Sequence, residues 1–210
     1  MVTQKQLEDA MDQRFSKEIY EKLKNARVCI AGLGGLGSNI AIMLARSGIG
    51  TLKLVDFDTV DITNLNRQAY RIAHIGRLKT EALKEMIEEI NPYIKVETIT
   101  TKVTEENVTE LFKGEKILCE AFDNPEYKAL LVNSVLENSP ETLLLSGSGM
   151  AGYGSSNLIQ TKRKMKNFYV CGDEISDAYA GIGLLSPRVS ICAGHQANMV
   201  IRLILEEKNS

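Results

Sequence analysis

The hydrophobic pattern between residues 27 and 58 predicts a strand, a turn, a helix and a second strand. Residues 28–31 form a short apolar run typical of a buried strand, and six residues with four glycines follow it directly. Residues 38–46 place Ile40, Met43 and Leu44 at helical spacing. Residues 51–55 are again apolar, and Asp56 ends that run.

Strands and helices continue to alternate after this unit. The pattern predicts a loop over 59–76, helices over 77–90, from 104 and over 126–137, and strands over 94–100, 116–122 and 142–146. Such alternation is typical of an α/β fold, here a Rossmann-like, doubly wound and mostly parallel sheet. Ligands bind these sheets at the carboxyl ends of the strands.

The two ends of the chain depart from this alternation. Residues 1–25 are polar with apolar residues four apart, which predicts an N-terminal helical segment made of one helix or two short ones. Residues 147–210 are glycine-rich, then alternating, then helical from about Ser186. They predict antiparallel strands at the far edge of the sheet, a loop crossing the site and a closing helix. No repeat or linker interrupts residues 1–210, so we expect a single domain.

Composition is ordinary for a globular protein, with 44% hydrophobic and 25% charged residues. A net charge of −2 gives no general attraction to nucleic acid or to anionic membranes. No apolar run reaches the ~20 residues of a membrane span, and the N-terminus does not resemble a signal peptide. These features predict a cytoplasmic protein that binds neither membrane nor nucleic acid.

The glycine-rich turn is the first candidate for chemistry. Glycines let a backbone turn sharply and approach phosphates, and the following helix start offers unpaired N–H groups to an anion. Asp56, at the end of the second strand, can accept hydrogen bonds from ribose hydroxyls. A turn without a ligand is disfavoured, because four glycines in six residues stand in the right frame. The unit predicts a nucleotide site, although a dehydrogenase would show the same glycine spacing.

Polar residues after Asp56 favour a triphosphate. Arg67 could bridge phosphate oxygens with its planar guanidinium, and Lys79 could reach the same phosphates from the next helix. Asp123 ends another strand and could hold Mg²⁺, which prefers carboxylate and phosphate oxygens. Taken singly, the two cations could be surface charges, and Asp123-Asn124 before a proline could be a turn or a helix cap.

These motifs together resemble the ThiF/MoeB family, the bacterial relatives of ubiquitin-activating enzymes. The matching segments are GLGGLGS at 32–38, SGIGTLKLVDFDTVDITNLNRQ at 47–68, GRLK at 76–79, INP at 90–92 and DN at 123–124. SGSGMAGYG at 146–154 and AGIGLLSP at 180–187 match more loosely. The resemblance covers nearly the whole chain.

The resemblance implies an adenylyltransferase that uses Mg-ATP to activate the C-terminal glycine of a small ubiquitin-like sulfur carrier and releases pyrophosphate. By the resemblance, Gly35 lies against the phosphates, Asp56 takes the ribose, and Asp123 binds magnesium and is indispensable. Asp123, Arg67 and Lys79 are the expected catalytic residues. The expected ATP-binding set is Gly32, Gly34, Gly35, Gly37, Asp56, Asp58, Asn64, Arg67, Lys79, Asp123, Asn124 and Lys17.

Three departures from the family pattern matter. The arginine that reaches the partner's ATP in a family homodimer is Lys17 here, which keeps the charge and loses the bidentate fork. The two C-x-x-C zinc pairs are missing, so we expect no zinc. The stretch 177–181 lacks the sulfur-transfer cysteine of some relatives. Cys171, expected in a loop, is the remaining candidate for reaction with a sulfur donor such as a cysteine desulfurase.

The short, zinc-free form resembles the ThiF branch linked to thiamin (thiazole) biosynthesis, so the expected carrier is ThiS-like and ends in Gly-Gly. The same chemistry could serve a molybdopterin or another sulfur carrier, or threonylcarbamoyladenosine on tRNA. The net charge and the lack of a basic stretch argue against tRNA. A nicotinamide-dependent oxidoreductase would leave Arg67, Lys79 and Asp123 without roles. A non-catalytic nucleotide-binding partner protein would be consistent with Lys17 and the missing cysteine.

Overall fold

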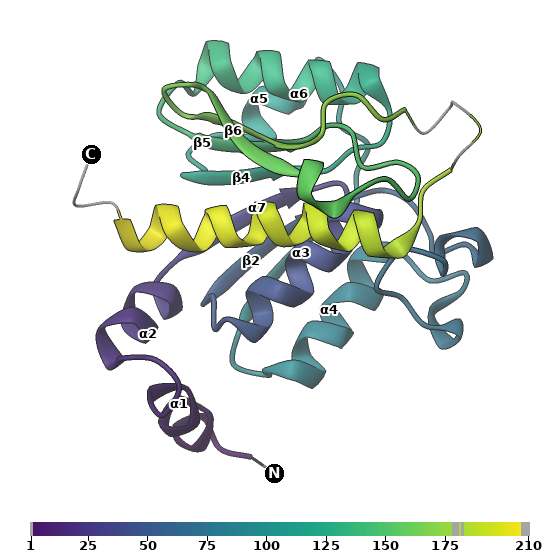
Figure 1. Ribbon diagram of the computed structural model, residues 1–210. Coiled ribbons are helices and arrows are strands. Elements are labelled where there is room, and N and C mark those ends of the chain that lie inside the picture. Colours follow the sequence, from purple (N-terminus) through teal and green to yellow (C-terminus); the bar gives the residue numbers. More distant parts are fainter. Residues whose placement is uncertain (1, 178–180, 182, 207–210) are drawn as a thin grey trace.

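A seven-stranded sheet forms the centre of the protein in a computed structural model that describes residues 2–177, 181 and 183–206. The strand order is β3-β2-β1-β4-β5-β7-β6, and every neighbouring pair is parallel except β6 and β7. The predicted doubly wound α/β fold with antiparallel strands at one edge is therefore confirmed. In Figure 1, α3, α4 and α7 lie on one side of the sheet, and α5 and α6 lie on the other.

The elements follow the predicted alternation closely. The strands are β1 Arg27–Ala31, β2 Thr51–Val55, β3 Lys95–Ile99, β4 Ile117–Glu120, β5 Leu143–Gly147, β6 Gln160–Met165 and β7 Phe168–Gly172. The helices are α1 Gln4–Asp12, α2 Lys17–Lys24, α3 Gly35–Arg46, α4 Lys79–Ile90, α5 Val108–Phe112, α6 Pro125–Asn138 and α7 Ser186–Glu206. Short 3-10 helices cover Ile62–Asn64 (η1), Ile72–His74 (η2) and Ser156–Leu158 (η3).

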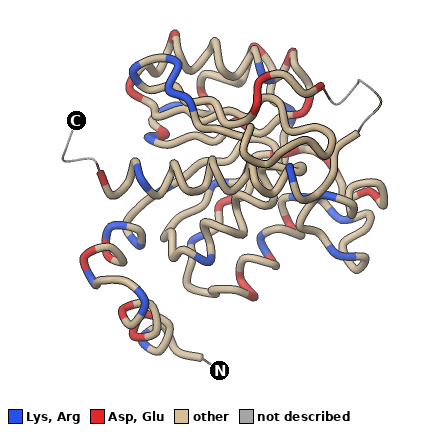
Figure 2. The backbone as a smooth tube through the Cα atoms, viewed as in Figure 1, with Lys and Arg blue, Asp and Glu red and all other residues tan. Residues whose placement is uncertain are grey.

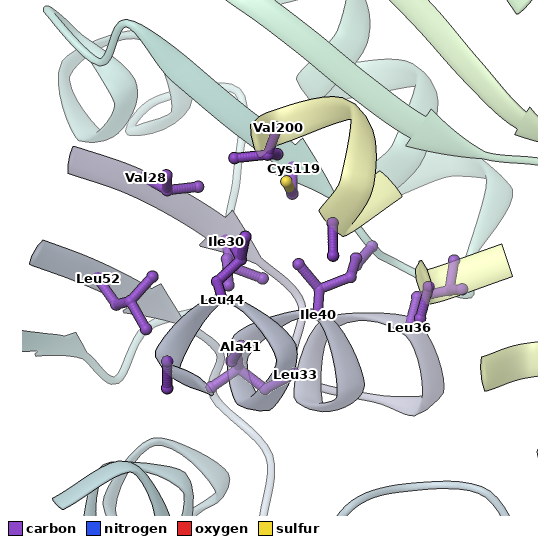
Figure 3. Close-up of a cluster of buried hydrophobic side chains, with 14 of the residues drawn as sticks. Val28, Ile30, Leu33, Leu36, Ile40, Ala41, Leu44, Leu52, Cys119 and Val200 are labelled. Atoms are coloured by element: carbon purple, nitrogen blue, oxygen red, sulfur yellow. The ribbon is translucent and has the colours of Figure 1, made fainter. Parts of the chain in front are cut away.

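Two apolar clusters hold the helices to the sheet. On one face Ile30 of β1 packs with Ile40 and Leu44 of α3 and with Val200 of α7 (Figure 3). On the other face Leu118 and its neighbours meet α5 and α6. Burying one such side chain contributes about 1.5–3 kcal/mol. The loops at the carboxyl ends of the strands are thus carried on a rigid base.

Three local expectations need comment. The N-terminal segment forms two helices, and α1 buries none of its residues. The helix expected from residue 104 begins at Val108, because Asn107 turns back to accept the Thr104 N–H. Residues 178–180, inside the expected crossover loop and the stretch 177–181, lie outside the described residues, as do residues 207–210 at the end of the chain.

Charged side chains are distributed over most of the chain (Figure 2). One buried group lies at the amino ends of the strands, away from the ligand edge. There Glu115 accepts hydrogen bonds from Arg27 and from Lys53, whose ammonium lies 3.0 Å from it. Arg27 also pairs with Glu97 at 2.8 Å. Within the part of the chain that the structure describes, no helix combines the length and apolarity that crossing a membrane requires.

Candidate functional site

A cavity of about 590 Å³ opens at the carboxyl ends of the parallel strands. Most of the residues expected at a nucleotide site line it: Gly32, Gly34, Gly35, Asp56, Asp58, Arg67, Lys79, Asp123 and Asn124. These residues come from five separate segments of the chain. The parallel topology brings them together because the carboxyl ends of β1, β2 and β4 meet at one edge.

Two glycines fix the shape of the turn after β1. Gly32 has φ +87°, and a Cβ there would lie 2.8 Å from the Ala121 carbonyl oxygen. A Cβ on Gly37 would lie only 1.8 Å from the Gly32 carbonyl oxygen. Glycine is therefore required at both positions for the start of α3 to pack this closely on the turn.

The start of α3 faces the cavity with its N–H groups. Gly34 is the N-cap, and no side chain caps the helix there. The first N–H groups of a helix have no acceptor within the helix and attract anions. Arg67 lies against this helix start, because a Cβ on Gly35 would lie 3.5 Å from the Arg67 Cγ. The positive end of the α3 dipole and the Arg67 guanidinium together make this part of the cavity suitable for phosphate.

Asp56 is 7% exposed and supports the turn directly. One carboxylate oxygen accepts the Leu33 N–H at 2.6 Å, and the other accepts the Asp58 N–H at 2.8 Å. The Tyr70 hydroxyl donates to the Leu33 carbonyl from the other side at 2.9 Å. Burial raises the pKa of Asp56, and the positive charge of Lys79 opposes that shift. Each carboxylate oxygen retains acceptor capacity for a ribose hydroxyl.

Lys79 is the most buried cation of the cavity. Its residue is 6% exposed, and its ammonium donates to Asp58 at 2.7 Å. The backbone of Lys79 also donates to the Asp58 carbonyl at 2.9 Å. Asp58 is exposed, so this pair joins a buried ammonium to an accessible carboxylate. The pair holds the charge in place while leaving two ammonium donors for phosphate oxygens.

Asp123 follows β4 and is exposed to the cavity. Within the described residues, no hydrogen bond or ion pair involves its carboxylate. Asn124 lines the cavity as well. It is the N-cap of α6, and its side-chain oxygen accepts the N–H groups of Glu126 and Tyr127.

The other end of the cavity is apolar and aromatic. Phe57, Val103, Phe122 and Tyr127 line it, and Phe122 and Tyr127 meet edge to face with ring centroids 6.4 Å apart. The Lys102 ammonium lies 5.0 Å from the Tyr127 ring centroid. Flat aromatic surfaces beside one cation suit a nucleobase.

Three expected site residues do not line the cavity. Gly37 has the packing role described above. The Asn64 side chain accepts the Asp61 N–H and closes the η1 turn. The backbone carbonyl of Asn64 accepts the N–H groups of Arg67 and Gln68. Lys17 is the exposed first residue of α2, away from the cavity of its own chain.

A buried polar group that contacts the cavity-lining Lys128 was missed in the sequence. Glu120 is 0% exposed and accepts from the Ser146 hydroxyl and the Lys128 ammonium, each at 2.5 Å. Lys128 lines the cavity. The available signal was an acidic residue inside an otherwise apolar strand, followed by a lysine in the first turn of the helix that begins after Asp123-Asn124.

The cysteines are all buried. The expectation that Cys171 lies in a reactive loop is wrong, because it sits in β7 with 0% exposure. Burial raises the pKa of Cys171 to about 11, against a weaker opposing effect from Thr161. Cys192 packs beside it and donates to the Cys171 carbonyl. His195 contacts the Thr161 hydroxyl through Nδ1 at 3.0 Å, a structural position.

The expectation of no basic stretch also needs correction. The edge strand β6 carries Lys162, Arg163 and Lys164, and Lys166 follows in the turn. Glu174 neutralises part of this charge through ion pairs with Lys162 at 2.9 Å and Lys164 at 2.6 Å. Lysines on an edge strand also prevent pairing with other sheets.

Comparison with known proteins agrees with this geometry. The profile of the ThiF family matches residues 7–210. The molybdopterin-synthase adenylyltransferase of Salmonella typhimurium is 30% identical over 195 residues, which cover 90% of this chain and 77% of that protein. The tRNA threonylcarbamoyladenosine dehydratase of Haemophilus influenzae is 36% identical over 137 residues, or 64% of this chain and 52% of that protein.

Solved structures show the same fold. The E. coli tRNA N6-threonylcarbamoyladenosine dehydratase TcdA, in complex with AMP, gives a TM-score of 0.88 at 21% identity, covering 100% of this chain and 99% of that chain. The chain spans about half the length of several curated relatives, for example 44% of the adenylyltransferase and sulfurtransferase MOCS3 of Dictyostelium discoideum.

Proposed function

Because the chain belongs to the ThiF family, we propose that it uses Mg-ATP to adenylate the terminal carboxylate of a small ubiquitin-like sulfur carrier. One observation carries this proposal. The Asp123 carboxylate, which has no partner among the described residues, lines the same cavity as the helix start of α3, Arg67 and Lys79. A dehydrogenase has no use for this combination of charges.

The reaction requires positioning and charge neutralisation. A carboxylate oxygen of the carrier forms a bond to the α-phosphorus of ATP, and the bond from that phosphorus to pyrophosphate breaks. No general base is needed, because a terminal carboxylate is ionised at neutral pH. Arg67, Lys79 and the N–H groups of α3 neutralise charge on the phosphates. Asp56 binds the ribose, and the aromatic end of the cavity binds adenine.

Magnesium fits the residues at Asp123. Mg²⁺ commonly takes one or two protein carboxylates and completes its shell with phosphate oxygens and water. Within the described residues, no three His, Cys, Asp or Glu side chains are grouped so that they could hold a metal by themselves. Asp123 would therefore hold the ion together with the triphosphate, where the ion neutralises charge on the phosphates.

The carrier is a finer part of the proposal. The resemblance of the sequence motifs to the ThiF branch supports a ThiS-like carrier of thiamin biosynthesis that ends in Gly-Gly. A similar enzyme from Salmonella typhimurium is named for molybdopterin synthase, which makes a molybdopterin carrier the nearest variant. We further propose a homodimer in which Lys17 of one subunit reaches the ATP of the other; the position of Lys17 outside the lining of its own cavity supports this.

A second candidate is activation of threonylcarbamoyladenosine on tRNA. The similarity to the H. influenzae dehydratase and the fold shared with TcdA, which has been solved with AMP and with ATP, favour it. The basic residues of β6 could contact phosphates of an RNA. Both candidates begin with ATP activating a carboxylate, so the substrate distinguishes them.

ATP–pyrophosphate exchange tests the function. We expect exchange only when Mg²⁺ and a carrier ending in Gly-Gly are both present, and we expect Asp123→Ala to abolish exchange without unfolding the protein. Exchange that requires modified tRNA in place of a carrier would select the second candidate. ATP binding without exchange on either substrate would support a non-catalytic role.

A further inference from the structure

We propose that Lys128 binds the attacking carboxylate of the acceptor and that Glu120 and Ser146 position its ammonium. This inference rests on the proposed adenylation and deepens it. Lys128 of α6 lines the cavity, and its ammonium contacts the buried Glu120 of β4 and Ser146 of β5; the three side chains were not recognised in the sequence.

The strand pairing sets the geometry. Glu120 and Ser146 are direct partners in the β4–β5 register, so their side chains point to the same face of the sheet. That face is covered by α6, whose Lys128 reaches down to both: its ammonium lies 2.5 Å from the Glu120 carboxylate and 3.4 Å from the Ser146 hydroxyl. The other Glu120 oxygen accepts the Phe122 N–H at 2.7 Å. Glu120 therefore has partners on both oxygens and cannot rotate freely.

A purely structural role, in which the ion pair between Lys128 and Glu120 only attaches α6 to the sheet, explains this arrangement poorly. Burying a carboxylate completely is costly, and an apolar pair of similar volume usually stabilises a fold as well or better. Leu118 and Leu144 already attach this face to α6 through the neighbouring apolar cluster. Lys128, by contrast, keeps 27% of its side chain exposed and lines the cavity. Its ammonium has three donors, and two protein acceptors are found among the described residues, so one donor remains for a ligand.

The position along the sheet identifies the ligand group. The ribose is assigned to Asp56 after β2, adenine to the aromatic residues that include Tyr127, and the phosphates to the turn after β1. Lys128 and Ser146 belong to the β4–β5 side, beside the segment 147–150 that also lines the cavity. An acceptor that attacks the α-phosphorus from the side opposite pyrophosphate has to place its carboxylate there.

The test uses a short acetylated peptide ending in Gly-Gly, once with a free carboxylate and once as the C-terminal amide. Binding is followed by NMR titration of the full chain, loaded with Mg²⁺ and an ATP analogue that has a methylene group between the α- and β-phosphorus. We expect the wild type to prefer the carboxylate by about tenfold or more, as for a charge-assisted hydrogen bond. Lys128→Met should remove the preference and leave the affinity for the nucleotide within about twofold.

Two variants separate binding from structure. Lys128→Arg should retain part of the preference, whereas Glu120→Gln should weaken it because the ammonium loses its anchor. Lys113→Met, at an exposed lysine paired only with Glu110 among the described residues, is the matched control and should behave as wild type.

The outcomes are distinct. Equal binding of the two peptides by the wild type overturns the proposal. Loss of nucleotide affinity in Lys128→Met with the peptide preference intact also overturns it, because Lys128 would then serve a phosphate. A Lys128-dependent preference in a protein that catalyses no exchange would retain the carboxylate site and refute the proposed adenylation.

Discussion

The clearest prediction concerns two glycines of the turn that were expected to act alike. A Cβ on Gly37 would lie 1.8 Å from the Gly32 carbonyl oxygen and 2.9 Å from the Gly32 carbonyl carbon. Since carbon–oxygen contacts below 3.0 Å are essentially never seen for a Cβ, the start of α3 would have to move away from the turn by roughly 1 Å. A backbone carbonyl cannot rotate away as a side chain can.

We expect Gly37→Ala to lower the free energy of unfolding by about 3 kcal/mol, at the upper end of the usual cost of overpacking. For a domain of this size that corresponds to a fall in Tm of roughly 6–12 °C. Gly34→Ala is the matched control, because its φ is −77° and the nearest atom to a Cβ lies 3.8 Å away. Its unfolding free energy should change by less than about 1 kcal/mol.

The variant that leaves stability nearly unchanged should be the one that weakens nucleotide binding. Gly34→Ala places a methyl group in the cavity beside the helix N–H groups, so it should weaken ATP binding about tenfold or more in a folded protein. Urea unfolding followed by circular dichroism and calorimetric titration with Mg-ATP measure both quantities. A Gly37→Ala protein as stable as the wild type would refute the close approach of α3 to the turn.

Two further predictions concern burial and pH. At pH 8 a small alkylating reagent should modify none of the four cysteines of the native protein within minutes and all four in urea, as counted by mass spectrometry. All four are buried, and the pKa of the Cys171 thiol is raised to about 11. Rapid labelling of Cys171 in the native protein would restore it as a sulfur-transfer candidate. Hydrogen bonds from Arg27, and to a smaller extent from Lys95, lower the pKa of Glu97 from 4.5 to about 2. Since the folded-state pKa is depressed, the stabilisation is present above pH ~4.5 and is lost as the pH falls toward 2. Glu97→Gln should therefore lower the free energy of unfolding by about 1–2 kcal/mol at pH 7 and by almost nothing near pH 2, as measured by urea unfolding at both pH values. The value at pH 7 is reduced for solvent screening of this partly exposed pair. An equal cost at both would exclude the ion pair as its source.

Much of the fold could be predicted because its signals are local. The apolar runs around Val28 and Leu52, the helical spacing at Ile40 and the glycines between them need only neighbours in the chain. The alternation of strands and helices then limits the topology to parallel pairing with right-handed connections. That was sufficient to expect Asp56, Lys79 and Asp123 at one edge.

Roles that depend on contacts between distant segments were not predictable. Cys171 was expected in a loop, whereas pairing of β7 with β5 and β6 buries it.

The sequence by itself determined the elements, their order and the glycine-rich turn, because hydrophobic periodicity and backbone conformation act over a few residues. Only the tertiary structure decided which polar residues meet. Glu120 and Ser146 are 26 residues apart and become direct partners through the β4–β5 register, and Lys128 reaches them from the opposite layer. Such a site arises from strand register and helix packing, which no local pattern encodes.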